Sequence, residues 1–121
     1  MGLNNPGGER KKGRRAIDAA IRLVDEALRG QREIGVPDMA EACFLSESHF
    51  RRQFTAIMGE SPKSYLMRRR MELAEELLRD GEQTVTEISF RCGFHNHSTF
   101  YREFVKHYGC NPTEYRERNG G

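Results

Sequence analysis

Of all the residues in this chain, His95 and His97 most resemble part of a metal site or of a nuclease centre. They lie two residues apart. Imidazole is a common metal ligand and a common general base. Ligands on one helix face stand three or four residues apart, however, and no cysteine or carboxylate cluster completes a set around this pair. The sequence therefore predicts no metal site, no cofactor and no catalytic residue, and we expect that the protein is not an enzyme.

The residue between the two histidines, Asn96, suits the first turn of a helix instead. Asparagine is a favoured N-cap because its side-chain oxygen accepts hydrogen bonds from free backbone N–H groups. Phe100 and Phe104 follow at a spacing of four, which places both rings on one face of that helix. We expect the two rings to point into a core.

The segment around the histidines repeats an earlier one. "SHFRRQF…GESPKSY" (48–65) returns as "STFYREF…GCNPTEY" (98–115), and "DMAEACFL" (38–45) aligns with "EISFRCGF" (87–94). Seven identical pairs carry the first match at a spacing of 50 residues: Ser48 and Ser98, Phe50 and Phe100, Arg52 and Arg102, Phe54 and Phe104, Gly59 and Gly109, Pro62 and Pro112, and Tyr65 and Tyr115. The pattern predicts a duplicated unit of a short helix, a turn and a longer helix.

Capping residues give the boundaries of these helices. Ser61-Pro62 and Asn111-Pro112 each place a capping oxygen before a proline that suits the first helical turn, and Thr84 with Glu87 forms a capping box. We therefore expect helix-turn-helix units at about 36–59 and 85–109, a connecting helix at about 62–80 and a final helix at about 112–118. The domain as a whole is expected over 14–118, and residues 1–13 are expected to form a disordered arm or a linker.

Composition limits the class of protein without deciding it. The chain has 121 residues, 20 Lys and Arg against 18 Asp and Glu, and a formal net charge of +2. This charge is too small to indicate nucleic-acid binding, so only the placement of the arginines can do so. Three cysteines without a paired spacing indicate reduced thiols, and the absence of an apolar N-terminal run predicts no signal peptide, no membrane span and a cytoplasmic location.

In a helix-turn-helix, the second helix lays its N-terminal residues along base edges in the major groove. The repeat leaves polar and basic side chains on the exposed side of both second helices. An alternative is that the arginines form an ordinary solvated face, and Arg68 to Arg70 on the connecting helix are as compatible with ion pairs to neighbouring glutamates as with phosphate contacts. The predicted DNA-contact residues are Ser46, Ser48, Arg51, Arg52, Asn96, His97, Ser98, Tyr101 and Arg102.

The second unit, "EISFRCGFHNHSTFYREFVKHYGCNPTEYR", resembles the C-terminal DNA-binding domain of the AraC/XylS family of bacterial transcriptional regulators. The resemblance covers about residues 14–118. It implies an all-α domain of about seven helices, with two helix-turn-helix units joined by a long linker helix that bind successive major-groove segments of asymmetric sites near promoters. It also implies double-stranded promoter or operator DNA as the partner, with RNA polymerase and an N-terminal sensor domain on a longer protein as further partners to test.

The chain departs from the family pattern at the first turn. The second unit keeps a glycine, Gly93, where the family has one, but the first unit has Phe44 there. A bulky residue with positive φ costs about 1 kcal/mol or more, so we expect the first turn to have another geometry. A helical protein-interaction domain without specific DNA binding remains the alternative function.

Overall fold

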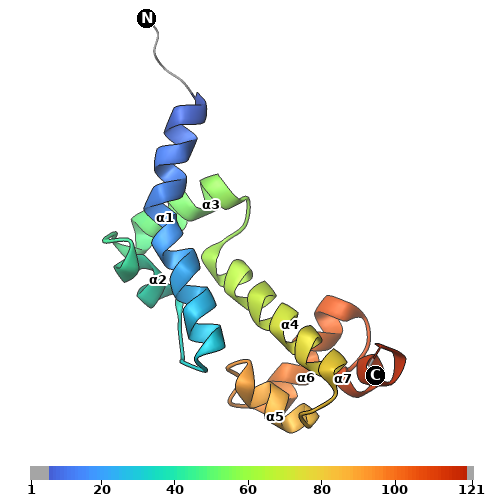
Figure 1. Cartoon of the computed structure of the whole chain (residues 1–121). Coiled ribbons are helices and arrows are strands. Elements are labelled where there is room, and N and C mark those ends of the chain that lie inside the picture. The colour runs from blue at the N-terminus through green and yellow to red at the C-terminus, as the bar shows by residue number, and fades with distance from the viewer. Residues whose placement is uncertain (1–5, 120–121) are drawn as a thin grey trace, which may run out of the picture. The chain divides into compact units, whose positions relative to one another are not determined.

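The computed structural model describes the backbone of residues 6–119 and the side chains of residues 14–119. Over this range the chain folds into α-helices without a β-strand, which confirms the predicted all-α fold with two helix-turn-helix units (Figure 1). The helices are α1 (Pro6–Arg29), α2 (Val36–Ala42), α3 (Glu47–Met58), α4 (Pro62–Asp80), α5 (Val85–Arg91), α6 (His97–Tyr108) and α7 (Pro112–Asn119).

Helix α1 begins at Pro6, well before the expected start near Arg14. Proline suits this first helical turn. Residues 1–5 lie outside the described part of the chain, and a disordered arm or linker over residues 1–13 stays a prediction.

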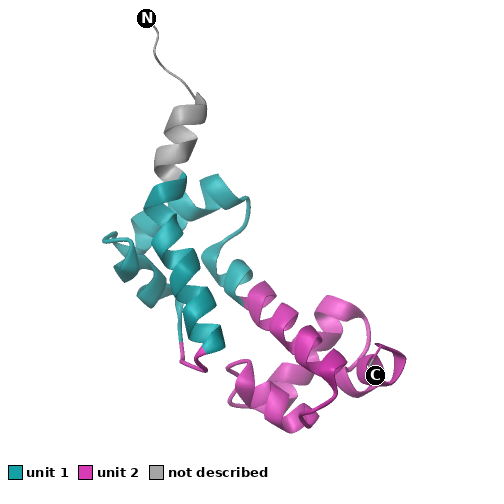
Figure 2. Ribbon diagram, viewed as in Figure 1, with its two compact units in different colours: residues 1–29, 34–66 teal, residues 30–33, 67–121 magenta. Residues whose placement is uncertain are grey.

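The chain divides into two compact units, drawn in two colours in Figure 2. The first comprises α1, α2, α3 and the first turn of α4. Its core is formed by apolar residues that α1 places at helical spacing, packed against those of α2 and α3. The buried residues of this unit include Ile17, Ala20, Val24, Met39, Ala40, Phe50, Phe54 and Tyr65.

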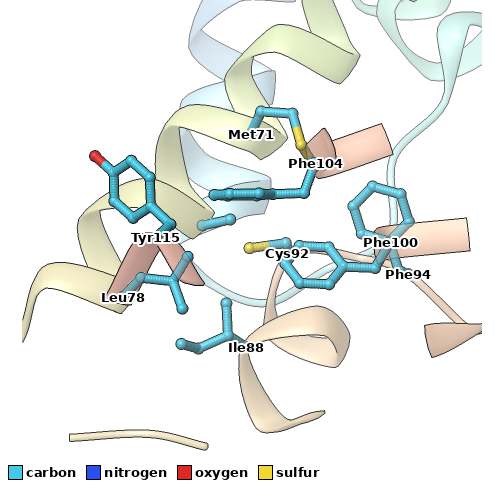
Figure 3. Close-up of a cluster of buried hydrophobic side chains, with 9 residues drawn as sticks. Met71, Leu78, Ile88, Cys92, Phe94, Phe100, Phe104 and Tyr115 are labelled. Carbon is cyan, nitrogen blue, oxygen red and sulfur yellow. The ribbon is translucent and has the colours of Figure 1, made fainter. Parts of the chain in front are cut away.

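The second unit comprises residues 30–33 and the chain from Met67 onward. Side chains from α4, α5, α6 and α7 converge in one cluster, which includes Met71, Ile88, Phe100 and Phe104 (Figure 3). The cluster also contains Ala74, Leu78, Cys92, Phe94 and Tyr115.

The same three-ring contact recurs in both units. In the first, ring centroids lie 5.4 Å apart for Phe50 and Phe54 and 5.3 Å apart for Phe54 and Tyr65. In the second, the equivalent distances are 5.9 Å for Phe100 and Phe104 and 5.5 Å for Phe104 and Tyr115. Both phenylalanine–tyrosine pairs meet edge to face, which is a favoured arrangement of aromatic rings. The sequence repeat is therefore a repeat of packing.

Both helix-turn-helix turns also share one backbone geometry. Leu45 N–H donates to the carbonyl of Ala40 at 3.1 Å, and Phe94 N–H donates to the carbonyl of Ser89 at 3.0 Å. This six-residue bond, with a left-handed residue before its donor, is a Schellman motif. The left-handed residues are Phe44, with φ 57°, and Gly93, with φ 93°. The expectation of another geometry in the first turn was wrong, because the hydrogen bonds of the turn hold Phe44 in the left-handed conformation while its side chain, 95% exposed, projects into solvent.

Because Phe44 is strained and exposed, Phe44→Gly should stabilise the protein. A left-handed conformation costs an L-residue about 1 to 2 kcal/mol, and the extra freedom of glycine in the unfolded chain offsets part of this gain. We expect the free energy of unfolding, measured by urea denaturation, to rise by about 0.5 to 1 kcal/mol.

Gly93→Ala is the matched control. It should lower the free energy of unfolding by about 1 to 2 kcal/mol, since it introduces the same strain and places a Cβ 3.4 Å from Nε of Arg70. A loss of stability on Phe44→Gly would show that the ring makes a stabilising contact.

A cluster of polar side chains lies beside the core of the second unit. Tyr115 Oη donates to Glu75 Oε2 at 2.5 Å, and Arg79 Nη2 donates to the same oxygen at 3.1 Å. Tyr108 Oη lies 3.1 Å from the carbonyl of Met71 and 3.4 Å from Glu75 Oε1. Burial, and then the charge of Glu75, raise the pKa of Tyr108 well above its usual range. The cluster therefore holds Tyr108 in its neutral form.

This raised pKa predicts a loss of stability in alkaline solution. The neutral phenol contributes fully below the pKa of tyrosine in the unfolded chain, near 10, and its contribution is lost as the pH rises toward the folded-state pKa. The free energy of unfolding should therefore fall more steeply above about pH 10 in the wild type than in Tyr108→Phe. Denaturation followed by circular dichroism between pH 8 and pH 11 measures this, and parallel profiles would contradict it.

Candidate nucleic-acid interface

Helix α3 presents its first turns to solvent. The Ser46 side chain caps the helix by accepting from the backbone N–H of His49 at 3.2 Å. Phe50 and Phe54 are fully buried, so the opposite side of the helix carries exposed side chains. The predicted contact residues Ser48, Arg51 and Arg52 lie on that exposed side.

The two arginines of α3 differ in their partners. Arg51 Nη2 donates to Glu47 Oε1 at 2.7 Å, one helical turn earlier, in an ion pair that remains solvent-accessible. Arg52 is exposed and, among the residues that the structure describes, makes no hydrogen bond or ion pair. The guanidinium of Arg52 is therefore available to an external ligand, whereas that of Arg51 is already oriented.

Helix α6 repeats this arrangement with different side chains. The Asn96 side-chain oxygen accepts from the N–H groups of Ser98 at 2.8 Å and Thr99 at 3.2 Å, as an N-cap does. Ser98 and Arg102 are exposed on the side opposite Phe100 and Phe104. Arg102, like its counterpart in α3, has no hydrogen-bond or ion-pair partner within the described chain.

An aromatic pair spans the first two turns of α6. The rings of His97 and Tyr101 have centroids 4.5 Å apart, and the Tyr101 hydroxyl lies 3.0 Å from Thr113 Oγ1 in α7. Tyr101 is half-buried and packs against the core of the second unit, so its ring orientation is fixed from both ends. It presents a rigid ring edge beside the exposed His97.

The two histidines of the opening motif have separate partners. His95 Nε2 lies 2.8 Å from Glu33 Oε1, and both side chains are about four-fifths exposed, while the ring of His97 contacts that of Tyr101. Within residues 14–119, no group of three or more histidine, cysteine, aspartate or glutamate side chains could hold a metal ion. The two histidines thus have different partners, Glu33 for His95 and the ring of Tyr101 for His97.

The nine predicted contact residues form two sets, one at the start of α3 and one at the start of α6, and we call these two helices the recognition helices. Each set occupies the N-terminal turns, with one capping residue and one unpartnered arginine. The set on α3 is Ser46, Ser48, Arg51 and Arg52, and the set on α6 is Asn96, His97, Ser98, Tyr101 and Arg102.

Sequence reasoning missed the partners of these residues. Glu47 orients Arg51, and His49 shares a 3.1 Å hydrogen bond with Gln53 on the same helix. The repeat alignment could have pointed to Glu47 as a residue of this surface, because Glu47 occupies the position that the predicted contact residue His97 has in the other unit. On the connecting helix, Arg68 and Arg69 pair with Glu72 at 3.1 and 3.4 Å, as the ion-pair alternative anticipated.

No helix among the described residues combines the length and apolar character needed to cross a lipid bilayer. The two duplicated units, each with a capped recognition helix that exposes polar and basic side chains, define the chain as a double helix-turn-helix domain. Its membership of a family can be judged by comparison with known proteins.

A family model described as a helix-turn-helix domain matches residues 39–118. The probable transcriptional regulator LumQ of Photobacterium leiognathi is 33% identical over 86 residues, which cover 71% of this chain and 35% of LumQ. A probable AraC family transcriptional regulator from Rhodopseudomonas palustris is 26% identical with a TM-score of 0.75, covering 88% of this chain and 99% of that one. The DNA-binding domain of the global transcriptional factor AdpA, solved with a target DNA, has a TM-score of 0.74 at 27% identity, covering 83% and 91%.

The chain therefore belongs to the AraC-type helix-turn-helix family of transcriptional regulators. The chain matches about a third of the length of curated relatives such as LumQ.

Because His95 and His97 have separate partners, chelation should leave the protein unchanged. Treatment with EDTA should shift neither the melting temperature nor the helical circular dichroism signal, since the side chains that the structure describes form no metal-ligand set on which folding could depend. Elemental analysis of the purified protein supplies the control. Zinc at one atom per chain, removed by EDTA with a lowered melting temperature, would contradict this prediction.

Proposed function

We propose that this chain is the DNA-recognition part of a transcriptional regulator, with α3 and α6 in successive major-groove segments of promoter or operator DNA. The single observation that carries the proposal is the equivalent placement of Arg52 and Arg102. Both arginines are exposed on the side opposite the phenylalanine core and lack a protein partner within the described residues. The AdpA domain, which has a similar fold, is seen with a target DNA, and this supports the same use of the fold here.

The exposed residues suit different parts of a DNA site. An arginine fork matches the O6 and N7 acceptors of guanine, so Arg52 and Arg102 are assigned to base edges. Ser48 and Ser98 can donate to phosphates or bases. Ser46 and Asn96 fix the helix starts, and the amide group of Asn96 keeps its N–H donors for a phosphate.

The regulator as a whole extends this proposal. Since the chain matches about a third of the length of curated relatives, we propose a sensor domain on a longer parent protein and contact with RNA polymerase. The proposed location is the cytoplasm, and the proposed role is binding, without enzyme activity.

One observation favours a second candidate, a helical protein-interaction domain. Phe44 is 95% exposed in a strained turn, and an exposed aromatic ring is a frequent anchor at protein interfaces. This candidate predicts only weak, sequence-independent DNA binding.

Arg102→Ala tests the proposed function. DNA fragments are first selected from a random pool with the wild-type protein, and affinities for selected and random DNA are then measured by mobility shift across a salt series. We expect the substitution to cost about 1 to 3 kcal/mol on selected DNA and little on random DNA, because a base contact is lost. Wild-type affinity should fall steeply with salt as counterions compete for the phosphates.

Arg22→Ala, an exposed arginine of α1, is the matched control for the loss of charge and should show no specific defect. An equal loss on selected and random DNA would assign Arg102 to a phosphate. A pool from which the wild type enriches no sequence would favour the protein-interaction domain.

A further inference from the structure

Each recognition helix carries a pair of touching side chains at its first and fifth residues. In α3 the pair is Glu47 and Arg51, joined by an ion pair of 2.7 Å. In α6 the equivalent pair is His97 and Tyr101, whose rings are in contact at a tilt of 46° with centroids 4.5 Å apart. Both units thus have a side-chain contact at this position, but it is an ion pair in the first unit and a contact between two rings in the second.

Glu47 is an unexpected residue on a surface that faces DNA. A carboxylate there is repelled by phosphates and lowers affinity for any duplex. The fold does not require it, because α6 has no acidic residue in its first turn and forms the same capped helix. The side chain of Glu47 nevertheless remains 41% exposed and that of Arg51 59% exposed, so both reach solvent while paired.

The pair is chemically suited to one kind of base pair. The ion pair engages Oε1 of Glu47 and Nη2 of Arg51, which leaves Oε2 and the other guanidinium N–H groups available. In the major groove, a carboxylate accepts from cytosine N4, and arginine donates to guanine O6 and N7. The same carboxylate would meet only acceptors at guanine and at thymine O4, so it also acts against these two bases at the position of the cytosine.

We propose that Glu47 and Arg51 together determine specificity for a G·C base pair in the half-site bound by α3. Glu47 accepts from the cytosine, and Arg51, oriented by Glu47, donates to the guanine. The pair of His97 and Tyr101 contains no carboxylate, so α6 reads its half-site by different chemistry. This inference rests on the proposed function, and it gives the two half-sites different sequences although the units that bind them are duplicated.

The test is selection of bound fragments from a random DNA pool by the wild type, Glu47→Gln, Arg51→Gln and the double variant. Glu47→Gln should lose the preference for one G·C pair in one half-site, a discrimination of between about 5-fold and about 100-fold, and leave the other half-site unchanged. It should also bind random DNA more tightly, because a negative charge is gone. The double variant should lose no more discrimination than either single variant, since the two side chains act as one unit.

Two further variants separate charge from geometry. Glu26→Gln removes the same charge from an exposed position on α1 and should leave the selected sequence unchanged. Glu47→Asp keeps the charge but shortens the reach to Arg51, so it should lose the base preference while its affinity for random DNA stays low. Melting temperatures and circular dichroism confirm that each variant is folded.

Different results would overturn the proposed DNA-binding function and the proposed role of Glu47 and Arg51. If the wild type enriches no sequence, the proposed function is wrong. If the wild type enriches a bipartite sequence that Glu47→Gln and Glu47→Asp leave unaltered, the function stands and the assignment of Glu47 and Arg51 is overturned. Loss of preference in both half-sites together would also overturn it.

Discussion

The burial of one aromatic trio in each unit is the constraint on which the surface of the recognition helices depends. Phe50, Phe54 and Tyr65 fix α3, and Phe100, Phe104 and Tyr115 fix α6, through ring contacts of 5.3 to 5.9 Å. Two phenylalanines one turn apart leave a helix a single rotation that buries both. Every other side chain of the helix is then assigned to the core or to solvent, so the exposed arginines are a consequence of the packing.

Most of the helix boundaries could be predicted because their causes are local. Thr84 and Glu87 form the expected capping box, and Asn111 receives the N–H of Glu114 at 2.8 Å. A cap depends on a few neighbouring residues, so the sequence contains it completely. The exposure of Arg52 and Arg102 could be predicted for a similar reason, because the helical period relates each of them to nearby phenylalanines.

The features that sequence reasoning missed depend on contacts distant in sequence or on competing small energies. Phe44 adopts a left-handed conformation because the hydrogen bonds of the turn outweigh the strain in its own backbone. The bond between His95 and Glu33 joins residues far apart in the chain, and no local pattern relates them. The helical spacing of Glu47 and Arg51 shows that their side chains can meet. Spacing alone, however, does not distinguish a formed ion pair from two solvated charges.

The reactivity of Cys92 can report how often the second unit opens. The thiol is fully buried in the core of that unit, and burial raises its pKa to about 12. A thiol reagent can therefore attack it only when the surrounding helices separate and the thiolate forms. Its rate of modification measures how often the second unit opens, independently of the first unit, in which Cys43 is half-buried. The second core thus carries a thiol by which its own opening can be timed.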